Sequence, residues 1–456
     1  MSTHSKAAKR FVADAERLAW HDRALYAVRE KRDRMMETVP EWEELRRLSS
    51  EIKLHTLSRL GDYLCEFERN ATANGMQVHW AADAAEMNET VWELIRRHGG
   101  RRLVKSKSML AEECGLTPYL EARGVEAVES DLGERIMQLL HMPPSHIVLP
   151  AIAVRREEVG ALFERKMGTE AGNSDPTYLT HAARRALRQK FLEADVSMTG
   201  VNFAVASTGA LAVCTNEGNA DMGTSFADLH IAIMGIEKVI PDMEALGVFT
   251  RLLARSGTGQ PVTTYTSLYR RPDPGRQIHV ILVDNGRSEW LADEAHRNML
   301  KCLRCGACMN TCPVYRRSGG YSYSYFIPGP LGINLGMLRS PKLYHGNVSA
   351  CSLCYSCSGV CPAKIDLGEQ IYEWRQRLDG MGLADPMKKA AVKGMDFIMG
   401  GRHRFYGSIA LGHLAEKLPR GLVESGLNPW SAPGRALPPI AGQSFNAWWK
   451  KEKANK

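Results

Sequence analysis

Eight of the eleven cysteines in this 456-residue chain lie between residues 302 and 361. They form the pattern C-x-x-C-x-x-C-x-x-x-C-P twice, as Cys302, Cys305, Cys308, Cys312-Pro313 and as Cys351, Cys354, Cys357, Cys361-Pro362. This is the bacterial ferredoxin pattern, in which three cysteines bind one four-iron cluster and the fourth, before proline, binds the other. The spacing therefore predicts two 4Fe–4S clusters. One is held by Cys302, Cys305, Cys308 and Cys361, and the other by Cys351, Cys354, Cys357 and Cys312.

A tetrahedral zinc ion is the alternative for closely spaced cysteines. Zinc ribbons use two C-x-x-C pairs, so a third cysteine at the same interval and a following C-P are superfluous for zinc. The complete pattern, present twice, favours iron–sulfur. The chain must curl tightly around each cluster, and Gly306 and Gly359 are predicted to supply positive φ or close backbone approach.

A four-iron cluster with four cysteine ligands has no open coordination site, so it conducts single electrons and does not itself oxidise a substrate. Such a cluster carries a charge of about −2 when oxidised. Five cations stand beside the ligands and can offset this charge, although surface solubility explains each of them equally well: Lys301, Arg304, Arg316, Arg317 and Lys364.

The net charge of +8 is concentrated at the cysteine-containing end of the chain. Residues 301–456 hold 21 Lys and Arg against 9 Asp and Glu, whereas the residues before them hold 38 against 42. This basicity fits a solvated tail, a counter-charge for an anionic cofactor or a docking face for an acidic partner. Nucleic acid is not an expected partner, because the chain contains no recognisable nucleic-acid-reading motif.

The residues before the cysteines must form the elements that position them. Residues 5–60 are rich in Ala, Leu, Arg and Glu, which predicts helices. From residue 75 onward a short apolar strand precedes a helical segment four times, with the strands expected at 75–81, 101–106, 125–130 and 145–152. This alternation predicts a parallel sheet that is covered on both faces. Residues 201–219 predict two strands about a Thr208–Gly209 turn, and 228–240 and 276–286 predict further strands of the same sheet.

The cysteine motifs lie within helix-like sequence and are separated by a Gly-, Pro- and Tyr-rich insertion. The expected domains are a helical segment (1–60), an α/β domain (61–290), an all-α iron–sulfur domain (291–400) and a partly extended C-terminal extension (401–456). No run of eighteen apolar residues predicts a transmembrane helix, and the N-terminus has no apolar signal-peptide core. Together with clustered rather than scattered cysteines, this favours the cytoplasm.

The chain resembles the lactate utilization protein B family, the iron–sulfur subunit of a three-protein bacterial L-lactate oxidation system. The resemblance is carried, in order, by "PEWEELR" (40–46), "VKSKSMLAEECGL" (104–116), "PPSHIVLPAI" (143–152), "FAVASTGALAVCTNEGN" (203–219) and both cysteine motifs. It implies that the α/β region is a LUD domain, similar in fold to the sugar-phosphate isomerase and CoA-transferase superfamily. It also implies a helical ferredoxin-type domain around the cysteines. The chain departs from the family pattern at Ala153, where a His is common, and at Ser207, where an acidic residue is common.

Two segments of the α/β region are candidate ligand sites. Lys105, Ser106, Lys107 and Ser108 lie where a strand should pass into a helix, and are candidates for binding a carboxylate or phosphate. The alternative is a helix N-cap with solvated lysines.

The second candidate segment is a tight turn that contains Asn216, Glu217 and Asn219, in which Glu217 is a candidate catalytic carboxylate. Asn and Gly are also favoured in such a turn for backbone reasons alone. His146, within an apolar strand, is expected to be a hydrogen-bonded core histidine.

These features predict an electron-transfer subunit that works with the other subunits of a lactate oxidation system and passes electrons to an unidentified acceptor. One alternative is that the LUD domain is itself the substrate-binding enzyme, with clusters that serve or sense it. A redox-responsive scaffold is another. The terminal "FNAWWKKEKANK", with two Trp and four Lys, is expected to dock a partner subunit or to rest peripherally on an anionic membrane surface.

Overall fold

A computed structural model of the chain describes residues 3–415, 441 and 443–454. The chain divides into two compact units, Met1–Arg377 and Leu378–Lys456, and each is described by itself. The division falls within residues 291–400, which the sequence assigns to a single domain.

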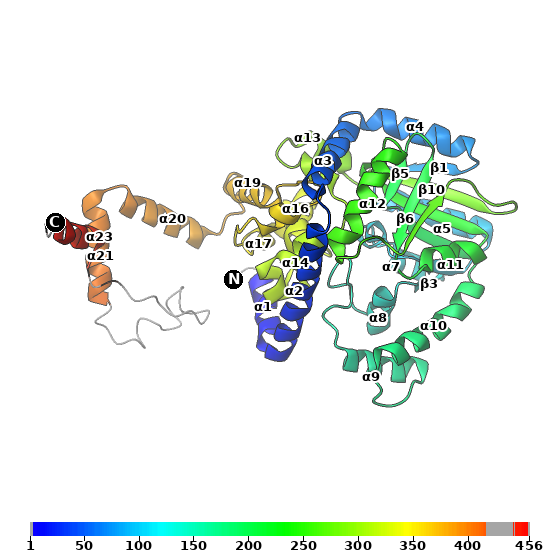
Figure 1. The fold of residues 1–456 in the computed structure, drawn as a ribbon, viewed down its shortest axis with the longest axis horizontal. Coiled ribbons are helices and arrows are strands. Elements are labelled where there is room, and N and C mark those ends of the chain that lie inside the picture. Colours follow the sequence, from blue (N-terminus) through cyan, green and yellow to red (C-terminus); the bar gives the residue numbers. More distant parts are fainter. Residues whose placement is uncertain (1–2, 416–440, 442, 455–456) are drawn as a thin grey trace. The chain divides into compact units, whose positions relative to one another are not determined.

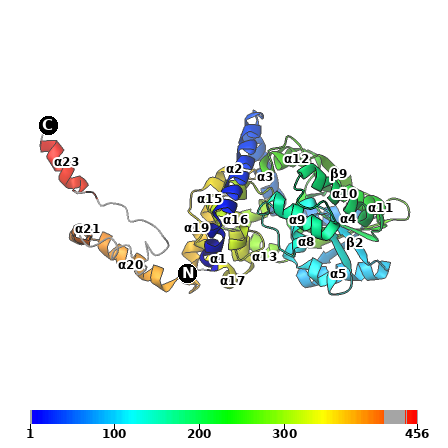
Figure 2. The same ribbon diagram turned by 90° about the horizontal axis from the view of Figure 1, so that it is seen from below.

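Four helices open the first unit: α1 (Thr3–Ala13), α2 (Ala15–Glu37), α3 (Trp42–Ser58) and α4 (Leu60–Ala73). Asp14 caps α2 by accepting a hydrogen bond from the Arg17 amide at 3.0 Å. Pro40 lies between α2 and α3. Its lack of a backbone N–H therefore interrupts the hydrogen bonds of neither helix. The predicted helices are confirmed. Helices α1 to α3 lie against the cysteine-containing region, as Figures 1 and 2 show, whereas α4 packs against β1 (Gln77–Ala81).

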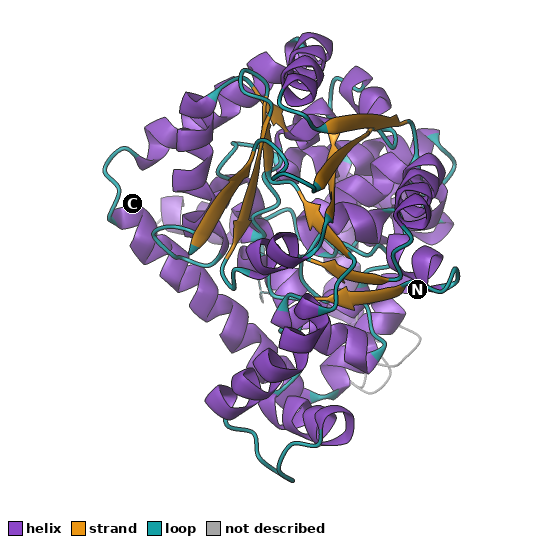
Figure 3. Ribbon diagram, turned by 90° about the vertical axis from the view of Figure 1, so that its right-hand side faces the viewer, coloured by secondary structure: helices purple, strands orange, loops and turns teal. Residues whose placement is uncertain are grey.

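A six-stranded parallel sheet forms the centre of the α/β region, and its strands are among those coloured orange in Figure 3. The strand order is β1-β10-β7-β4-β2-β3. Its other strands are β2 (Arg102–Lys105), β3 (Glu126–Glu129), β4 (Val196–Gly200), β7 (Leu229–Gly235) and β10 (Gln277–Val283). Along β7, Ile231 and Ile233 belong to one hydrophobic cluster, and Ala232 and Met234 belong to the other. This alternation means that both faces of the sheet are buried, which confirms the predicted covered parallel sheet.

Helices cover both faces of this sheet. One cluster contains residues of α5 (Ala84–His98), α6 (Met109–Glu113) and α7 (Leu116–Glu121), and the other contains residues of α4. The remaining helices of this region are α8 (Leu132–Leu140), α9 (Arg156–Met167), α10 (Pro176–Leu192), α11 (Asn219–Phe226), α12 (Met243–Gly257) and α13 (Arg287–Ala292).

A second, four-stranded sheet has the order β8-β5-β6-β9. It consists of β5 (Phe203–Val205), β6 (Ala210–Thr215), β8 (Val239–Ile240), which follows the short 3-10 helix η1 (Ile236–Lys238), and β9 (Tyr265–Tyr269). The predicted hairpin about Thr208–Gly209 is confirmed as the antiparallel β5–β6 pair. Its predicted place in the main sheet is wrong, because among the described residues β5 and β6 pair with each other and otherwise only with β8 and β9.

The fourth predicted strand, 145–152, does not form. The His146 ring accepts hydrogen bonds from the amides of Val148 and Leu149 at 3.0 Å each, so these amides have no need of a neighbouring strand. Pro143 and Pro144 before the segment, and Pro150 within it, restrict the backbone further. The helix predicted after it is present as α9.

Helical elements surround both cysteine motifs, and no strand follows β10 in the described part of the chain. They are η2 (Arg297–Lys301), α14 (Ala307–Thr311), α15 (Pro313–Ser318), η3 (Gly320–Ser322), α16 (Gly329–Arg339), α17 (Pro341–Val348), α18 (Ser356–Val360) and α19 (Leu367–Gly380). The predicted all-α character of this region is confirmed.

The second unit contains α20 (Pro386–Met399), α21 (Arg402–Ala415) and α23 (Phe445–Ala454). The sequence favoured a partly extended end to the chain, but α21 and α23 are helical, while residues 416–440 and 442 lie outside the described part. Trp448 and Trp449 are both exposed, and their ring centroids are 6.2 Å apart. None of the described helices combines the length and the apolar character needed to cross a membrane.

Candidate iron–sulfur centres and the adjoining cavity

The fold brings the first three cysteines of one motif together with the last cysteine of the other. Cys302, Cys305, Cys308 and Cys361 line one small cavity. Burial, and then the neighbouring Cys302 and Cys361, raise the pKa of Cys305 to about 12. A thiol so buried binds iron only as the thiolate, so cluster insertion must displace its proton.

Cys312 likewise lies among the cysteines of the second motif. Burial raises its pKa to about 12, and Cys351 and Cys354 add to this effect. Burial and the same group of thiols raise the pKa of Cys357 to about 12. The charge of Cys357 also raises the pKa of Cys308, since the helices that carry these two residues, α18 and α14, pack together.

The backbone repeats the same shape in both motifs. Arg304 and Leu353, two residues after the first cysteine of each motif, have φ of 60° and 55°. Gly306 and Tyr355, two residues further on, have φ of 78° and 57°. Non-glycine residues rarely adopt this left-handed conformation, so its recurrence indicates that each loop must curl around a bound group.

Gly306 fulfils its predicted role, since a Cβ there would lie 3.0 Å from His146. The positive φ predicted for Gly359 is wrong, because Tyr355 occupies the position that matches Gly306. No protein atom lies within contact distance of a Cβ added at Gly359.

Backbone amides are directed at four of the cysteine sulfurs. The amides of Arg304 and Tyr315 donate to Cys302 and Cys312 at 3.4 Å, and those of Leu353 and Ile365 donate to Cys351 and Cys361 at 3.3 Å. Hydrogen bonds to cluster sulfurs are among the determinants of reduction potential. Two groups of four thiols, all buried or half-buried except the exposed Cys354, with amide donors fit a pair of cubane clusters.

Four of the five cations beside the cysteines have partners elsewhere. Arg316 and Arg317 pair with Asp22, Lys364 pairs with Glu43, and Lys301 donates to Ser50. Arg304 is different, since its side chain makes no hydrogen bond or ion pair with any described residue and its Nη1 is buried.

Three arginines that the sequence did not single out hold the second motif in place. Arg46 of α3 donates to the carbonyls of Cys361 and Gly359 at 3.0 and 2.8 Å. Arg32 of α2 donates to the carbonyl of Val360, and Arg375 of α19 to that of Cys351. Arg46 lies within "PEWEELR", but nothing in that segment indicates a partner more than three hundred residues away.

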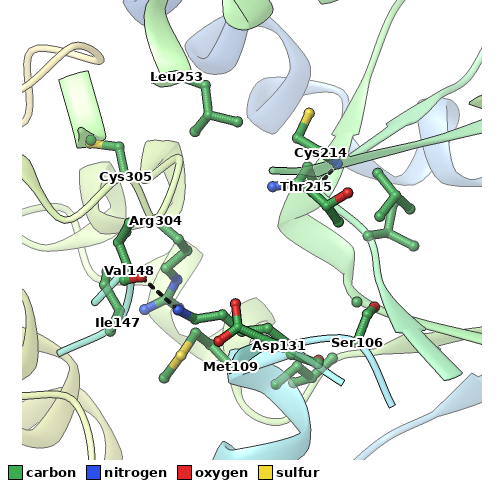
Figure 4. A pocket seen from close by; sticks show the side chains of 18 of the residues that line it. Ser106, Met109, Asp131, Ile147, Val148, Cys214, Thr215, Leu253, Arg304 and Cys305 are labelled. Atoms are coloured by element: carbon green, nitrogen blue, oxygen red, sulfur yellow. Dashed lines mark hydrogen bonds between the residues drawn. The ribbon is translucent and has the colours of Figure 1, made fainter. Parts of the chain in front are cut away.

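A cavity of about 320 Å³ opens at the carboxyl ends of β2, β4 and β7, where open parallel sheets bind ligands. Its walls also include Arg304 and Cys305 of the first cysteine motif. In Figure 4, Arg304 extends into the pocket beside Val148, while Thr215 and Cys214 lie on the opposite side. The cavity therefore lies between the α/β region and the first cysteine motif.

Most of the candidate ligand-binding residues meet at this cavity. Ser106 and Lys107 line it on one side, and Asn216, Glu217 and Asn219 line it on another. Partial burial, and then the Asp131 carboxylate, raise the pKa of Glu217. Ser108 also lines the cavity and caps α6, its hydroxyl accepting a hydrogen bond from the Ala111 amide.

Lys105 does not line the cavity. Its ammonium group is buried and lies 2.6 Å from Glu129 and 3.3 Å from Glu112. Burial alone would lower the pKa of Lys105, but the carboxylates of Glu129 and Glu112 outweigh it and raise the pKa.

A buried ion-pair network that the sequence did not predict forms another wall of the cavity. Arg287 lies 3.0 Å from Glu113 and 2.6 Å from Glu237. Arg287 belongs to the "VDNGRS" sequence after β10, where it begins α13. The two departures from the family pattern, Ala153 and Ser207, do not line the cavity.

His146 is a buried, hydrogen-bonded histidine, as expected. It contacts Asn310 Oδ1 through Nε2 at 3.0 Å. Burial lowers its pKa to about 3, so the ring is neutral near pH 7. Asn310 in turn donates to the carbonyl of Gly257, which joins the end of α12 to the first cysteine motif.

The fold and this site define a class of protein in which a LUD domain is joined to a dicluster iron–sulfur domain. The LUD domain family matches residues 64–289, and the 4Fe-4S dicluster domain family matches residues 298–365, which confirms the prediction of two 4Fe–4S clusters. The chain belongs to the lactate utilization protein B family. It is 39% identical to lactate utilization protein B of Bacillus pumilus, over 92% of this chain and 91% of that protein.

Two further relatives are similar over comparable lengths. Lactate utilization protein B of Oceanobacillus iheyensis is 38% identical over 92% of this chain and 91% of that protein. The "uncharacterized electron transport protein YkgF" of Escherichia coli K12 is 37% identical over 93% of this chain and 91% of that protein.

Proposed function

We propose that this chain is the iron–sulfur electron-transfer subunit of an L-lactate oxidation system. The observation that carries the proposal is the placement of the two cysteine groups: Cys305 of the first motif lines the α/β cavity, whereas Cys354 of the second motif is exposed. The names of the relatives, which refer to lactate utilization and electron transport, support the same role.

We assign Cys302, Cys305, Cys308 and Cys361 to one cluster and Cys312, Cys351, Cys354 and Cys357 to the other. When bound, the two clusters supply a path for single electrons and no open site for a substrate. Cys308 of the first group and Cys357 of the second group are both buried and close to each other, so we place the closest approach of the two centres at these residues. The exposed Cys354 and Tyr355 mark the surface where a redox partner can approach.

Oxidation of the 2-hydroxy acid itself is assigned to partner subunits of the system, which act in the cytoplasm. The exposed Trp448 and Trp449, with Lys450 and Lys451, are the proposed docking segment for a partner or for the surface of an anionic membrane. The α/β domain is proposed to share the fold of sugar-phosphate isomerases and CoA-transferases.

A second candidate function places the oxidation in this chain, with the α/β domain as the enzyme. The cavity at the carboxyl ends of the strands, in contact with Cys305, favours this alternative.

Anaerobic purification of the full chain distinguishes the two. The proposal expects about eight irons per chain and no reduction of the iron–sulfur signal by L-lactate until the partner subunits are added. D-lactate serves as the control for stereospecificity. Reduction of the isolated chain by L-lactate would show that the α/β domain performs the oxidation. One zinc per motif would contradict both candidates.

A further inference from the structure

The cavity beside the first cysteine motif contains three basic side chains without a carboxylate partner. Lys107, Lys238 and Arg304 all line it, and none of them forms an ion pair with a described residue. Lys107 donates only to the carbonyl of Val148, at 3.0 Å. Arg287, in the same wall, is by contrast fully paired with Glu113 and Glu237.

Glu237 is near Lys238 and Arg304, but it is already paired with Arg287, so these two cations have no directly bonded carboxylate. Half-buried cations without a directly bonded counter-charge are costly, so this arrangement is matched to an anionic ligand. A carboxylate can accept charge-assisted hydrogen bonds from a guanidinium group and from ammonium groups at the same time. Arg304 is well placed for this role, since Figure 4 shows its side chain reaching into the pocket.

The cavity also contains unsatisfied polar atoms that a carboxylate alone cannot satisfy. Asn219 lines it, and the Asn219 Oδ1 is a buried acceptor without a hydrogen-bond partner. Thr215, at the end of β6, also lines the cavity and has a buried hydroxyl without a partner. An acceptor such as Oδ1 requires a donor, which a hydroxyl group supplies.

We infer that this cavity binds a hydroxycarboxylate, with its carboxylate on Arg304, Lys107 and Lys238 and a hydroxyl group on Asn219 and Thr215. The inference rests on the proposed function and gives its α/β domain a ligand. A volume of about 320 Å³ is at the lower end of the range for small-molecule sites, about 300 to 1,000 Å³. It therefore accommodates hydroxy acids longer than lactate as well.

The bound anion would lie against the first cysteine motif. The amide of Arg304 donates to Cys302 Sγ, and Cys305 lines the same cavity. A negative charge placed there disfavours addition of an electron nearby, so occupancy should make the midpoint potential of the adjacent centre more negative.

Calorimetric titration of the anaerobic, full-length protein with its iron bound tests the inference. The ligands are L-lactate, propionate, which lacks the hydroxyl group, gluconate, which is longer, and inorganic phosphate. The expected result is binding of a hydroxy acid at least about tenfold tighter than propionate, because the hydroxyl group satisfies a buried acceptor. No binding of either hydroxy acid, tighter binding of phosphate, or equal binding of propionate would overturn the inference.

Matched variants locate the site. Lys107→Gln and Arg304→Gln should weaken hydroxy-acid binding by about tenfold or more, since each removes a charged hydrogen-bond donor. Asn219→Ala should reduce the preference for lactate over propionate. Lys166→Gln, at an exposed lysine at the end of α9, is the control and should change nothing. Lys107 lies outside the cysteine loops, so its variant keeps the test valid even if Arg304→Gln impairs cluster insertion.

A redox titration followed by electron paramagnetic resonance supplies a second measurement, with and without saturating ligand. The midpoint potential of the centre next to the cavity should become more negative when the ligand is bound, and that of the other centre should not change. If the hydroxy acid binds but the partner subunits never reduce the protein, the inference stands and the proposed function fails. If reduction occurs without any binding by the isolated chain, the inference fails alone.

Discussion

Two pairs of residues in the left-handed conformation shape the cysteine loops. Arg304 matches Leu353, and Gly306 matches Tyr355. The sequence suggested that glycine would occupy such positions, yet three of the four are not glycine. The strain is tolerated because an amide–sulfur hydrogen bond fixes each loop internally, and Arg46 also binds the backbone of the second motif.

The proposed assignment of the fourth cysteine of each motif to the other motif's cluster makes a prediction about pairs of substitutions. Cys305→Ser with Cys361→Ser should abolish one of the two paramagnetic centres and spare the other, because both residues are assigned to the same cluster. Cys305→Ser with Cys312→Ser should abolish both. Iron analysis and electron paramagnetic resonance of the reduced protein measure the outcome. The reverse pattern would show that each motif binds its own cluster.

Glu134 makes stability depend on pH. It is buried beside Glu129, and burial, followed by the charge of Glu129, raises its pKa to about 8. The folded state therefore holds a proton that the unfolded chain releases near pH 4.5, so stability falls as the pH rises from about 4.5 to 8.

Glu134→Gln removes this titration. It should raise the melting temperature at pH 8.5 by about 2 °C or more and have little effect at pH 5. Thermal unfolding at both pH values, with the exposed Glu164→Gln as control, measures the difference. An equal effect at the two pH values would show that Glu134 is already ionised in the folded protein.

At the scale of elements, helix α3 performs a task that its own sequence does not reveal. Arg46 crosses to the second cysteine motif and binds the carbonyls of Gly359 and Cys361. Its neighbour Arg47 faces solvent and pairs only with Glu44 and Glu51 of the same helix.

Arg46→Ala should therefore destabilise the folded protein by about 2–4 kcal/mol, because it leaves the buried Cys361 carbonyl and the part-buried Gly359 carbonyl without these donors. It should also speed the loss of iron to a chelator such as bathophenanthroline. Arg47→Ala is the matched control and should leave the rate of iron loss unchanged. Equal rates for the two variants would mean that the second motif keeps its shape without α3.

The elements most reliably predicted from sequence were those with local signals. The three strand–helix units from residue 75 to 141 follow from apolar runs next to capped helices, such as α5 behind Asp83. Residues 145–152 have the same apolar character, but His146 supplies a local acceptor that competes with strand pairing. Which sheet the β5–β6 hairpin would join depends on β8 and β9, and nothing within the hairpin indicates them.

In the candidate site, too, only the features with a local sequence signal could be predicted. The cysteine spacing predicts the clusters directly, whereas Lys107, Glu217 and Arg304 come together only through the tertiary fold. Lys105 and Lys107 are indistinguishable in sequence. Lys105 is the last residue of β2 and forms a buried ion pair with Glu129, whereas Lys107 follows the end of the strand and lines the cavity.

At the scale of the whole molecule, the first unit contains the motif cysteines and the arginines that bind their backbone. All eight motif cysteines, and Arg32, Arg46 and Arg375, lie before Leu378. The N-terminal helices α1 to α3 pack against the cysteine region although some three hundred residues separate them in sequence (Figure 2).

A chain ending at residue 384 should therefore retain its full iron content and its spectrum. A chain that lacks residues 1–38 should lose iron, because it lacks α1, α2 and the Arg32 donor. Iron analysis and the visible absorption spectrum of the two truncated proteins provide the comparison. Loss of iron from the chain that ends at residue 384 would show that the second unit is needed for stable iron binding.

The contact between α2, α3 and the second motif has a consequence for biosynthesis. The ribosome completes these helices long before it reaches Cys361, so their buried arginines and apolar faces must wait for partners while the α/β domain is made. In the proposed assignment, the two clusters have all their ligands only when Cys357 and Cys361 have emerged, because each motif contributes its last cysteine to the other cluster. Metal loading is therefore the closing step of assembly, and it joins the first-made and last-made parts of this unit.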